Sequence, residues 1–437
     1  MRIQPDQIDR ARGALVGLAC GDAVGTTLEF KAPGSFEPIR DMVGGGPFSL
    51  EPGQWTDDTS MALCLAASLL ARDGCDPVDQ LNRYVQWRDD GYMAATGQCR
   101  DIGNTVNAAL EHFQRTNAAD SGSRDESASG NGALMRLAPV VLFNIGDPEA
   151  ARRDAIVATI TTHGSMLCQQ ASEVFAALLH ALLSGRDRAE LLSREGMQNL
   201  MQDRELDPRI MAVIEGSFRD KEPPEIRGTG FVVASLEAAL WAFHHAVDFE
   251  DGALRAANLG DDADTTAAIY GQLAGAYFGL SGIPTHWRER LQNAQVMIDM
   301  ADALVMRLSS AVLLEAKQLC QLLVADPEHG VLLGLLDLRD GTLGINNYSD
   351  FTQSWHYSRI PDAMTGLVEL AAGATWFSRA EHLCWGAFGG HVSSGDIPRH
   401  FDNMGNRLRD LRDFMEVGAL VPEWMREQPF CKFSSPF

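Results

Sequence analysis

Apolar residues recur at helical spacing through most of the first 310 residues. Five stretches, rich in Ala, Leu and Gly, show this most clearly: residues 8–21, 59–72, 156–183, 231–247 and 265–279. Apolar positions three and four residues apart predict helices with one buried face. Small residues on such faces let helices pack closely. Strand-like alternation is sparse, so the pattern predicts an all-α domain over residues 1–310.

One long polar segment interrupts the helices. Residues 116–132 (TNAADSGSRDESASGNG) are dominated by Ser, Gly, Asn and Asp, a composition typical of a loop. Long loops inside compact domains are more often functional than decorative. We therefore expect this loop to contribute to a site.

The pattern changes after about residue 310. Aromatic residues become denser, and extended-looking stretches such as VLLGLLDL from Val331 precede two expected helices near 364–373 and 406–417. We predict that residues 311–437 form an additional α+β domain of unknown role. Its aromatic residues and histidines are more simply explained as a core than as a site.

Charge and composition narrow the class of protein. The 437 residues carry a formal net charge of −23, which disfavours nucleic acid or an anionic membrane as the main partner. We find neither a run of 18 apolar residues nor the apolar core of a signal peptide, and so expect no membrane association. The eight Cys residues lack a CxxC pair or zinc spacing. They are typical of reduced thiols, which predicts a cytoplasmic protein.

The strongest chemical signal is QWTDDTS at residues 54–60, directly before an apolar helix. Thr56, Asp57 or Asp58 could be the N-cap of that helix. A cap needs one side chain, however, whereas this segment offers four consecutive side chains with oxygen atoms. Carboxylate and hydroxyl oxygens are also the ligands that Mg²⁺ and Mn²⁺ prefer. This segment alone leaves both explanations open.

A second acidic cluster, NLGDDADTT at residues 258–266, also precedes a small-residue helix. Asp262, Asp264 and Thr265 could direct three oxygens to one site from its first turn. The helix dipole favours each carboxylate individually, but crowded carboxylates are costly unless a cation neutralises them. The two clusters together predict a centre of two metal ions.

Three further carboxylates stand at notable positions. Asp22 lies in a glycine-containing segment and is either a turn or cap residue or a further acid. Glu29 lies between Leu28 and Phe30, an unusual place for a carboxylate without a function. Asp101 precedes an expected helix, where a capping role and an acid/base role are equally open.

Two weaker motifs concern phosphate binding and a histidine. SGNGALMR at residues 129–136 places two glycines near an expected helix start, where backbone N–H groups can face phosphate oxygens. The same pattern is common in ordinary loops. His163 lies at the start of another helix, and packing or capping is its simpler explanation.

In this order, the motifs resemble the ADP-ribosylglycohydrolase family, in particular the bacterial branch similar to dinitrogenase reductase-activating glycohydrolase. The matching stretches lie within about residues 8–300, and TDDT together with the distant DADT is the specific pair. The resemblance implies an all-α fold with two Mg²⁺ or Mn²⁺ ions at the mouth of a cleft. It also implies removal of ADP-ribose from mono-ADP-ribosylated protein side chains, with arginine as the first expectation.

The resemblance further implies roles for individual residues. The metal ligands would be Thr56, Asp57, Asp58, Asp262, Asp264 and Thr265. The acid and base would be Asp101 and Glu29, without deciding which is which. The substrate contacts would be Gly130, Asn131, Gly132, Met135 and His163.

Two other functions are consistent with the same residues. The chain could be an immunity or binding protein that neutralises a cognate ADP-ribosyltransferase by docking, as well as or instead of hydrolysis. It could also be a metal-dependent phosphoesterase, which would release AMP rather than intact ADP-ribose. We expect an ADP-ribosylated protein as the substrate and a monomer as the oligomeric state.

Overall fold

The computed structural model describes residues 5–202 and 204–306, and five short strands further along the chain. The chain divides into two compact units, Met1–Arg307 and Leu308–Phe437, which are described separately. The functional division into a catalytic domain, 1–310, and an additional domain, 311–437, stays a prediction.

Helices make up the described part of the first unit. The longer ones are α1 (Pro5–Gly25), α2 (Asp57–Arg72), α3 (Pro77–Asp90), α4 (Asn104–Thr116), α6 (Pro148–Ile160), α7 (Met166–Leu183), α12 (Val232–His245), α14 (Ala263–Phe278) and α16 (Ala294–Met306). The shorter ones are α5 (Ala138–Phe143), α8 (Arg188–Leu191), α9 (Arg194–Leu200), α10 (Pro208–Ile214), α11 (Ser217–Asp220), α13 (Phe249–Ala257) and α15 (Thr285–Arg290). Single 3₁₀ turns are η1 (Thr26–Leu28), η2 (Glu126–Ala128), η3 (Leu134–Arg136) and η4 (Leu280–Gly282). Residues 5–202 and 204–306 contain no β-strand, which confirms the predicted helical fold of this part.

The stretch 156–183 is two helices rather than one. Helix α6 ends at Ile160 and α7 begins at Met166. Between them the chain passes close to another loop, and a Cβ atom on Gly164 would lie 2.4 Å from the carbonyl oxygen of Gly122. The Ser165 hydroxyl then accepts a hydrogen bond from the backbone N–H of Cys168 and caps α7. The break agrees with the helix start expected near His163, although the apolar spacing of residues 156–183 alone does not reveal it.

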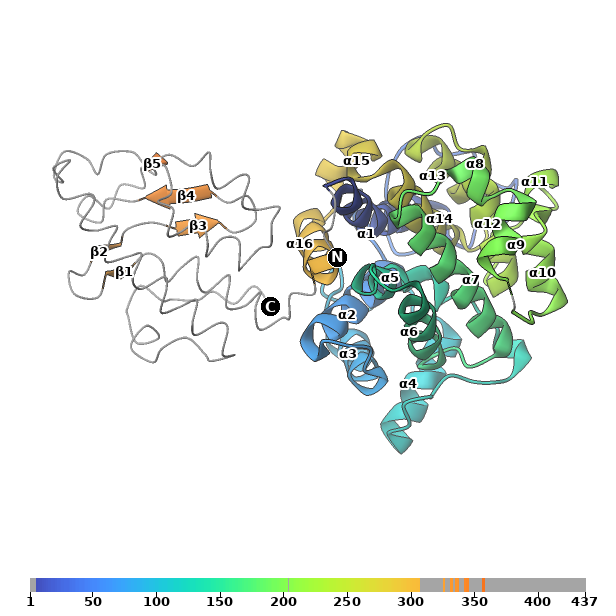
Figure 1. The fold of residues 1–437 in the computed structure, drawn as a ribbon, viewed down its shortest axis with the longest axis horizontal. Coiled ribbons are helices and arrows are strands. Elements are labelled where there is room, and N and C mark those ends of the chain that lie inside the picture. The colour runs from blue at the N-terminus through green and yellow to red at the C-terminus, as the bar shows by residue number, and fades with distance from the viewer. Residues whose placement is uncertain are drawn as a thin grey trace. The chain divides into compact units, whose positions relative to one another are not determined.

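Helices α1 and α14 lie side by side within the helical unit (Figure 1). Glycines one turn apart form their contact: Gly13, Gly17, Gly21 and Gly25 on α1, and Gly271 and Gly275 on α14. A Cβ atom on Gly17 would lie 2.3 Å from the carbonyl oxygen of Gly271, so no larger residue fits there. The antiparallel contact places the last turn of α1 against the first turn of α14.

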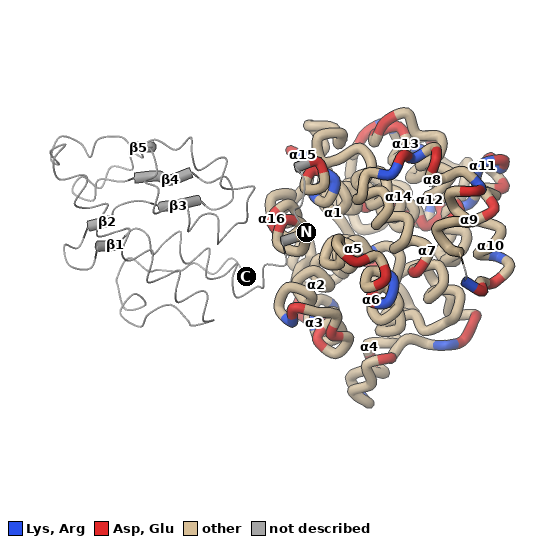
Figure 2. Tube along the Cα trace, viewed as in Figure 1, with Lys and Arg blue, Asp and Glu red and all other residues tan. Residues whose placement is uncertain are grey.

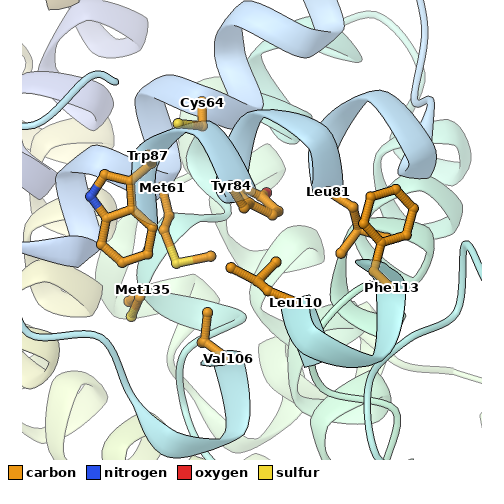
Figure 3. Packing of buried hydrophobic residues seen from close by; sticks show 9 residues of the cluster. All are labelled: Met61, Cys64, Leu81, Tyr84, Trp87, Val106, Leu110, Phe113 and Met135. Atoms are coloured by element: carbon orange, nitrogen blue, oxygen red, sulfur yellow. The ribbon is translucent and has the colours of Figure 1, made fainter. Parts of the chain in front are cut away.

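A hydrophobic cluster joins α2, α3, α4 and η3 (Figure 3). Its buried members are Met61, Cys64, Leu81, Tyr84, Trp87, Val106, Leu110, Phe113 and Met135. Burial of large apolar side chains is the main force that holds helices together in water. The cluster therefore holds the helix that begins at Asp57 against the helix that follows Asp101.

Charge and hydropathy separate the surface from the interior. Peripheral helices such as α6 and α11 carry both acidic and basic residues (Figure 2).

Helix α7 is long and apolar enough to cross a bilayer by length and composition, with a mean hydropathy of 1.3. Because 72% of it is buried within the fold, it has the character of a core helix. The expected lack of membrane association stays a prediction.

The second unit is described only by its strands. Strand β1 (Ala325–Asp326) pairs antiparallel with β2 (Val331–Leu332). Strands β3 (Leu335–Asp337), β4 (Thr342–Ile345) and β5 (His356–Tyr357) form an antiparallel sheet in the order β3-β4-β5. The expected helices near 364–373 and 406–417 lie outside the described residues, so the α+β class stays a prediction.

Candidate active site

The N-terminus of α2 is capped by a side chain from α1. The two carboxylate oxygens of Asp22 accept hydrogen bonds from the backbone N–H groups of Thr56 and Thr59, at 2.9 and 3.0 Å. They also accept from both threonine hydroxyls, at 2.8 and 2.6 Å. Thr56 is the N-cap residue, yet its own side chain makes no capping bond. The side chains of Asp57 and Asp58 are therefore not needed as caps.

The N-terminus of α14 is capped in the same way. The Glu29 carboxylate accepts hydrogen bonds from the backbone N–H groups of Ala263 and Asp264, at 2.8 and 3.4 Å. The N-cap residue, Asp262, makes no capping bond with its own side chain. The backbone N–H of Phe30 donates to the carbonyl oxygen of Asp261, and the N–H of Asp261 donates to that of Lys31, so the two loops are held together at this point. Each acidic helix start is thus capped by a carboxylate that lies in the last turn of α1 (Asp22) or shortly after α1 (Glu29).

The carboxylates of Asp58 and Asp264, which do not cap these helices, lie close to the Thr56 hydroxyl. This oxygen lies 3.3 Å from Oδ2 of Asp58 and 3.2 Å from Oδ2 of Asp264, besides its bond to Asp22. One hydroxyl hydrogen cannot serve three carboxylates. The two acidic motifs, far apart in the sequence, therefore meet at a single point that is rich in oxygen and poor in hydrogen-bond donors.

Two groups of three carboxylates lie close enough to hold a cation. In each group, one oxygen from every residue lies within 4.8 Å of the others. One group is Asp22, Asp58 and Asp264, and the other is Glu29, Asp101 and Asp264. Asp264 belongs to both groups, so its carboxylate could contact a cation at either of two neighbouring positions.

Burial and mutual repulsion make these carboxylates unstable as bare anions. Burial raises the pKa of Asp58 well above its usual value, and the nearby charges of Asp22 and Asp264 raise it further. Burial and the neighbouring Asp58 have the same effect on the pKa of Asp57. Oδ1 of Asp58 is buried and has no hydrogen-bond partner among the described residues. This donor set of buried oxygens fits a hard divalent cation.

The two acid/base candidates lie on the same side of the cluster. Asp101 has a left-handed backbone conformation, with φ of 54°, in the loop before α4. Burial, followed by the charge of Asp262, raises the pKa of Asp101 to about 7. Burial and the charge of Asp264 raise the pKa of Glu29 further above its usual range.

The glycine-rich loop before η3 reaches the site through Asn131. Its side-chain N–H groups donate to Oδ2 of Asp262 at 2.9 Å and to the Ser235 hydroxyl at 2.7 Å. Its backbone N–H donates to the carbonyl oxygen of Gly230. The Asn131 amide therefore orients a carboxylate, while Gly130 and Gly132 lie beside the ring of His163.

The remaining predicted residues lie at the edges of the site. Met135 is buried in the hydrophobic cluster, and its sulfur is 4.0 Å from the Thr265 hydroxyl. Asp57 is 7% exposed and belongs to neither three-carboxylate group. His163 is buried, and burial together with the charge of Arg136 lowers its pKa to about 3. Its ring is therefore neutral at physiological pH.

Asp22, expected to be either a turn or cap residue or a further acid, is a cap, but of a helix to which it does not belong. It is fully buried near the end of α1 and caps α2. A signal was present, because a carboxylate among the apolar residues of a buried helix needs a partner. The identity of that partner depends on the packing of α1 against α2.

Comparisons with known proteins point to one family. A sequence model of the ADP-ribosylglycohydrolase family matches residues 3–312. The ADP-ribosylarginine hydrolase Tri1 of Pseudomonas putida (strain GB-1) is 43% identical over 303 residues, covering 69% of this chain and 80% of that protein. The Tri1 protein of Serratia proteamaculans (strain 568) is 39% identical over 301 residues, with coverage of 69% and 80%.

A more distant relative and a solved structure support the same assignment. The ADP-ribosyl-[dinitrogen reductase] glycohydrolase of Rhodospirillum rubrum is 30% identical over 291 residues, covering 66% of this chain and 92% of that protein. A solved chain of an ADP-ribosylglycohydrolase-related protein complex is 43% identical, with a TM-score of 0.62. The alignment covers 70% of this chain and all of the other. The chain thus belongs to the ADP-ribosylglycohydrolase family, enzymes that hydrolyse the glycosidic bonds of ADP-ribose.

Proposed function

We propose that this enzyme is a metal-dependent hydrolase that releases ADP-ribose from mono-ADP-ribosylated arginine side chains of proteins. The observation that carries the proposal is the meeting of the Asp58 and Asp264 carboxylates at the Thr56 hydroxyl. The choice of arginine is supported by the two relatives of 43% and 39% identity, which are ADP-ribosylarginine hydrolases.

Two Mg²⁺ or Mn²⁺ ions would be held by Thr56, Asp57, Asp58, Asp262, Asp264 and Thr265. Such ions can bind ribose hydroxyls and lower the pKa of a water molecule. Asp22 would act as a positioning residue, because both of its oxygens are occupied by the N–H and hydroxyl groups of Thr56 and Thr59. Asn131 would orient Asp262 through the bond to its Oδ2 atom.

Hydrolysis breaks the bond between C1″ of the ribose and the guanidino nitrogen. Water supplies the oxygen that joins C1″, and overall its proton replaces the one that the departing nitrogen takes from the acid. With a pKa of about 7, Asp101 can hold a proton at neutral pH, which suits the donor to the leaving guanidine. Glu29 would accept the proton from water through the oxygen that does not cap α14, once a cation beside Asp264 offsets the repulsion that helps to raise the pKa of Glu29.

The substrate would extend from this point over the loop before η3. Gly130 and Gly132 let the His163 ring pack against the loop, since a Cβ atom on Gly132 would lie 2.8 Å from Cε1 of that ring, and the diphosphate would bind at this loop. Asn131 and Met135 would support this surface indirectly. Asn131 would do so through its hydrogen bond to Asp262, and Met135 through its contact with Thr265.

Docking to a cognate ADP-ribosyltransferase is a second function of the same chain that we keep as an alternative. The additional domain would supply the docking surface, since the family match covers only residues 3–312. A stable complex between a transferase and an Asp57→Ala variant without hydrolase activity would support it. Absence of any complex would leave hydrolysis as the sole function.

We further propose a monomer in the cytoplasm. The described cysteines, Cys20, Cys64, Cys75, Cys99 and Cys168, are free thiols, as expected in a reducing compartment. Light scattering of the purified full-length chain would test the oligomeric state.

The linkage is tested with peptides that carry ADP-ribose on arginine or on serine. We expect metal-dependent release of intact ADP-ribose from the arginine peptide. Asp101→Asn should lower kcat by about a hundredfold or more, as is typical when an acid/base group is removed, while metal binding is retained. Full activity of Asp101→Asn would remove this residue from the mechanism, and release of AMP would instead indicate a phosphoesterase.

A further inference from the structure

Arg136 is a buried cation close to the site that the proposed mechanism does not use. It lies at the end of η3 and is 1% exposed. No carboxylate among the described residues forms an ion pair with it. Its guanidinium group lies instead over the ring of Tyr84, 4.7 Å from the centroid (Figure 3 shows the position of that ring). A buried charge without a partner of opposite sign is costly, so its other contacts must compensate.

These contacts join two separate segments of the chain. Nη1 of Arg136 donates to the carbonyl oxygen of Gly132 at 3.0 Å, within the glycine-rich loop. Nη2 donates to the Thr162 hydroxyl at 2.7 Å and to the Thr161 hydroxyl at 3.3 Å, in the turn between α6 and α7. One guanidinium group therefore fixes the loop and the turn relative to each other, with His163 between them.

The Thr162 hydroxyl links Arg136 to His163 by hydrogen bonds. Its oxygen lies 2.9 Å from Nδ1 of the imidazole. The guanidinium can only donate, so the threonine oxygen accepts from Arg136. If Nδ1 carried the proton, the buried Thr162 hydroxyl hydrogen would have no acceptor among the described residues, and an unsatisfied buried donor is costly. The hydrogen bond therefore runs from Thr162 to Nδ1, and the imidazole proton is on Nε2.

The Nε2 edge of the ring faces the two glycines. A Cβ atom on Gly130 would lie 3.2 Å from Nε2, and one on Gly132 would lie 2.8 Å from Cε1 and 3.3 Å from Nε2. A neutral ring with its proton on Nε2 is a hydrogen-bond donor at this surface.

We propose that Arg136 is a positioning residue: through Thr162 it fixes His163 as the Nε2–H tautomer and aims that donor at the surface of the Gly130–Gly132 loop, where the diphosphate of ADP-ribose binds. The ligand part of this inference rests on the proposed function. The tautomer does not, because it follows from the contacts of Arg136 and Thr162 alone. Arg136 touches no reacting atom, so its effect on substrate binding is indirect.

The test combines nitrogen NMR of the imidazole with ligand binding, on the full-length chain in Mg²⁺. With ¹⁵N-labelled histidine, and the His163 signals assigned from a His163→Gln variant, wild type should show a proton on Nε2 and none on Nδ1. In Thr162→Val the Nδ1 atom loses its donor, and both tautomers should appear. The Kd for ADP-ribose and the KM should rise about tenfold, the effect of losing one well-placed hydrogen bond, with kcat within about twofold.

Two variants separate this role from general stability. Thr162→Ser keeps the hydroxyl and should restore both the tautomer and the KM. Thr161→Val removes a neighbouring buried hydroxyl that also contacts Arg136 but not His163, and should leave both unchanged.

The outcomes are distinct. An Nδ1–H tautomer in wild type overturns the inference, even if Thr162→Val fails to fold. An unchanged Kd in a folded Thr162→Val protein overturns the positioning role. A wild-type protein that shows the Nε2–H tautomer but neither binds ADP-ribose nor releases it contradicts the proposed function instead.

Discussion

At the scale of single residues, the site depends on carboxylates that cap helices to which they do not belong. Asp22 caps α2 and Glu29 caps α14, so the acidic residues at both helix starts keep their oxygens free. A helix start normally uses its own polar side chain for this purpose. The arrangement gathers negative charge that lowers the stability of the protein until a cation binds.

This view predicts that a change that abolishes metal binding stabilises the metal-free protein. Asp58→Asn removes a buried charge whose Oδ1 atom has no partner among the described residues. In EDTA its free energy of unfolding should exceed that of wild type by about 1 kcal/mol, a gain typical when a functional site is relaxed. Thermal unfolding with EDTA and with Mn²⁺ measures both effects.

The control is Asp120→Asn, an exposed carboxylate paired with Arg124. It should change the midpoint little in either condition. A lower midpoint of Asp58→Asn in EDTA would show that the carboxylates do not repel one another as proposed.

The histidine beside the glycine loop gives a pH prediction. Burial and the charge of Arg136 lower the pKa of His163 to about 3, below its unfolded value of about 6.5. Its contribution to stability is therefore present above pH 6.5 and lost as the pH falls toward 3. NMR signals of the ring should stay constant from pH 8 to pH 5. A titration midpoint near 6.5 would contradict the buried, neutral state.

At the scale of elements, the contact between α1 and α14 fixes the distance between the two acidic motifs. The helices touch through backbone atoms along the glycines, and Gly25 lies against Ala263 and Asp264 at the site itself. A shift of one helix would separate the capping carboxylate of Glu29 from the start of α14.

Substitution in this contact should therefore affect stability and activity together. A Cβ atom on Gly17 would lie 2.3 Å from a backbone oxygen, so Gly17→Ala should lower the free energy of unfolding by about 1–3 kcal/mol. Its kcat should also fall, because the helices must move apart. Gly146→Ala is the matched control, since nothing lies within 4 Å of its Cβ position. Equal midpoints of urea unfolding for the two variants would rule out the close contact.

The sequence allowed the elements and the acidic motifs to be predicted to different extents. The helices at α1, α2, α12 and α14 followed from apolar spacing, since each buries a continuous face. The nearness of Asp58 to Asp264 followed from the cost of crowded carboxylates. The start of a helix after His163 and a capping role for Asp22 were both open to prediction. The contact of Gly164 with Gly122 and the identity of the helix that Asp22 caps were not, because both depend on which segments pack together.

At the scale of the whole molecule, the metal and the fold should be coupled. A cation that binds only the folded state raises the free energy of unfolding by about 2.7 kcal/mol at a concentration of about 100 times its Kd. We therefore expect EDTA to lower the melting temperature and Mn²⁺ to restore it. The Asp57→Ala variant should show no difference between the two conditions. If neither EDTA nor Mn²⁺ changed the melting temperature of wild type, the result would contradict a cation bound at these carboxylates.

The central claim is that the acidic helix starts hold the metal that hydrolysis requires. Its most direct test is the initial rate of ADP-ribose release from an arginine-ADP-ribosylated protein, in EDTA and after return of Mg²⁺ or Mn²⁺, for wild type and Asp57→Ala. We predict release of intact ADP-ribose by wild type only when the metal is present, and none by the variant in either condition. Equal release in EDTA, or full activity of Asp57→Ala, would contradict the account.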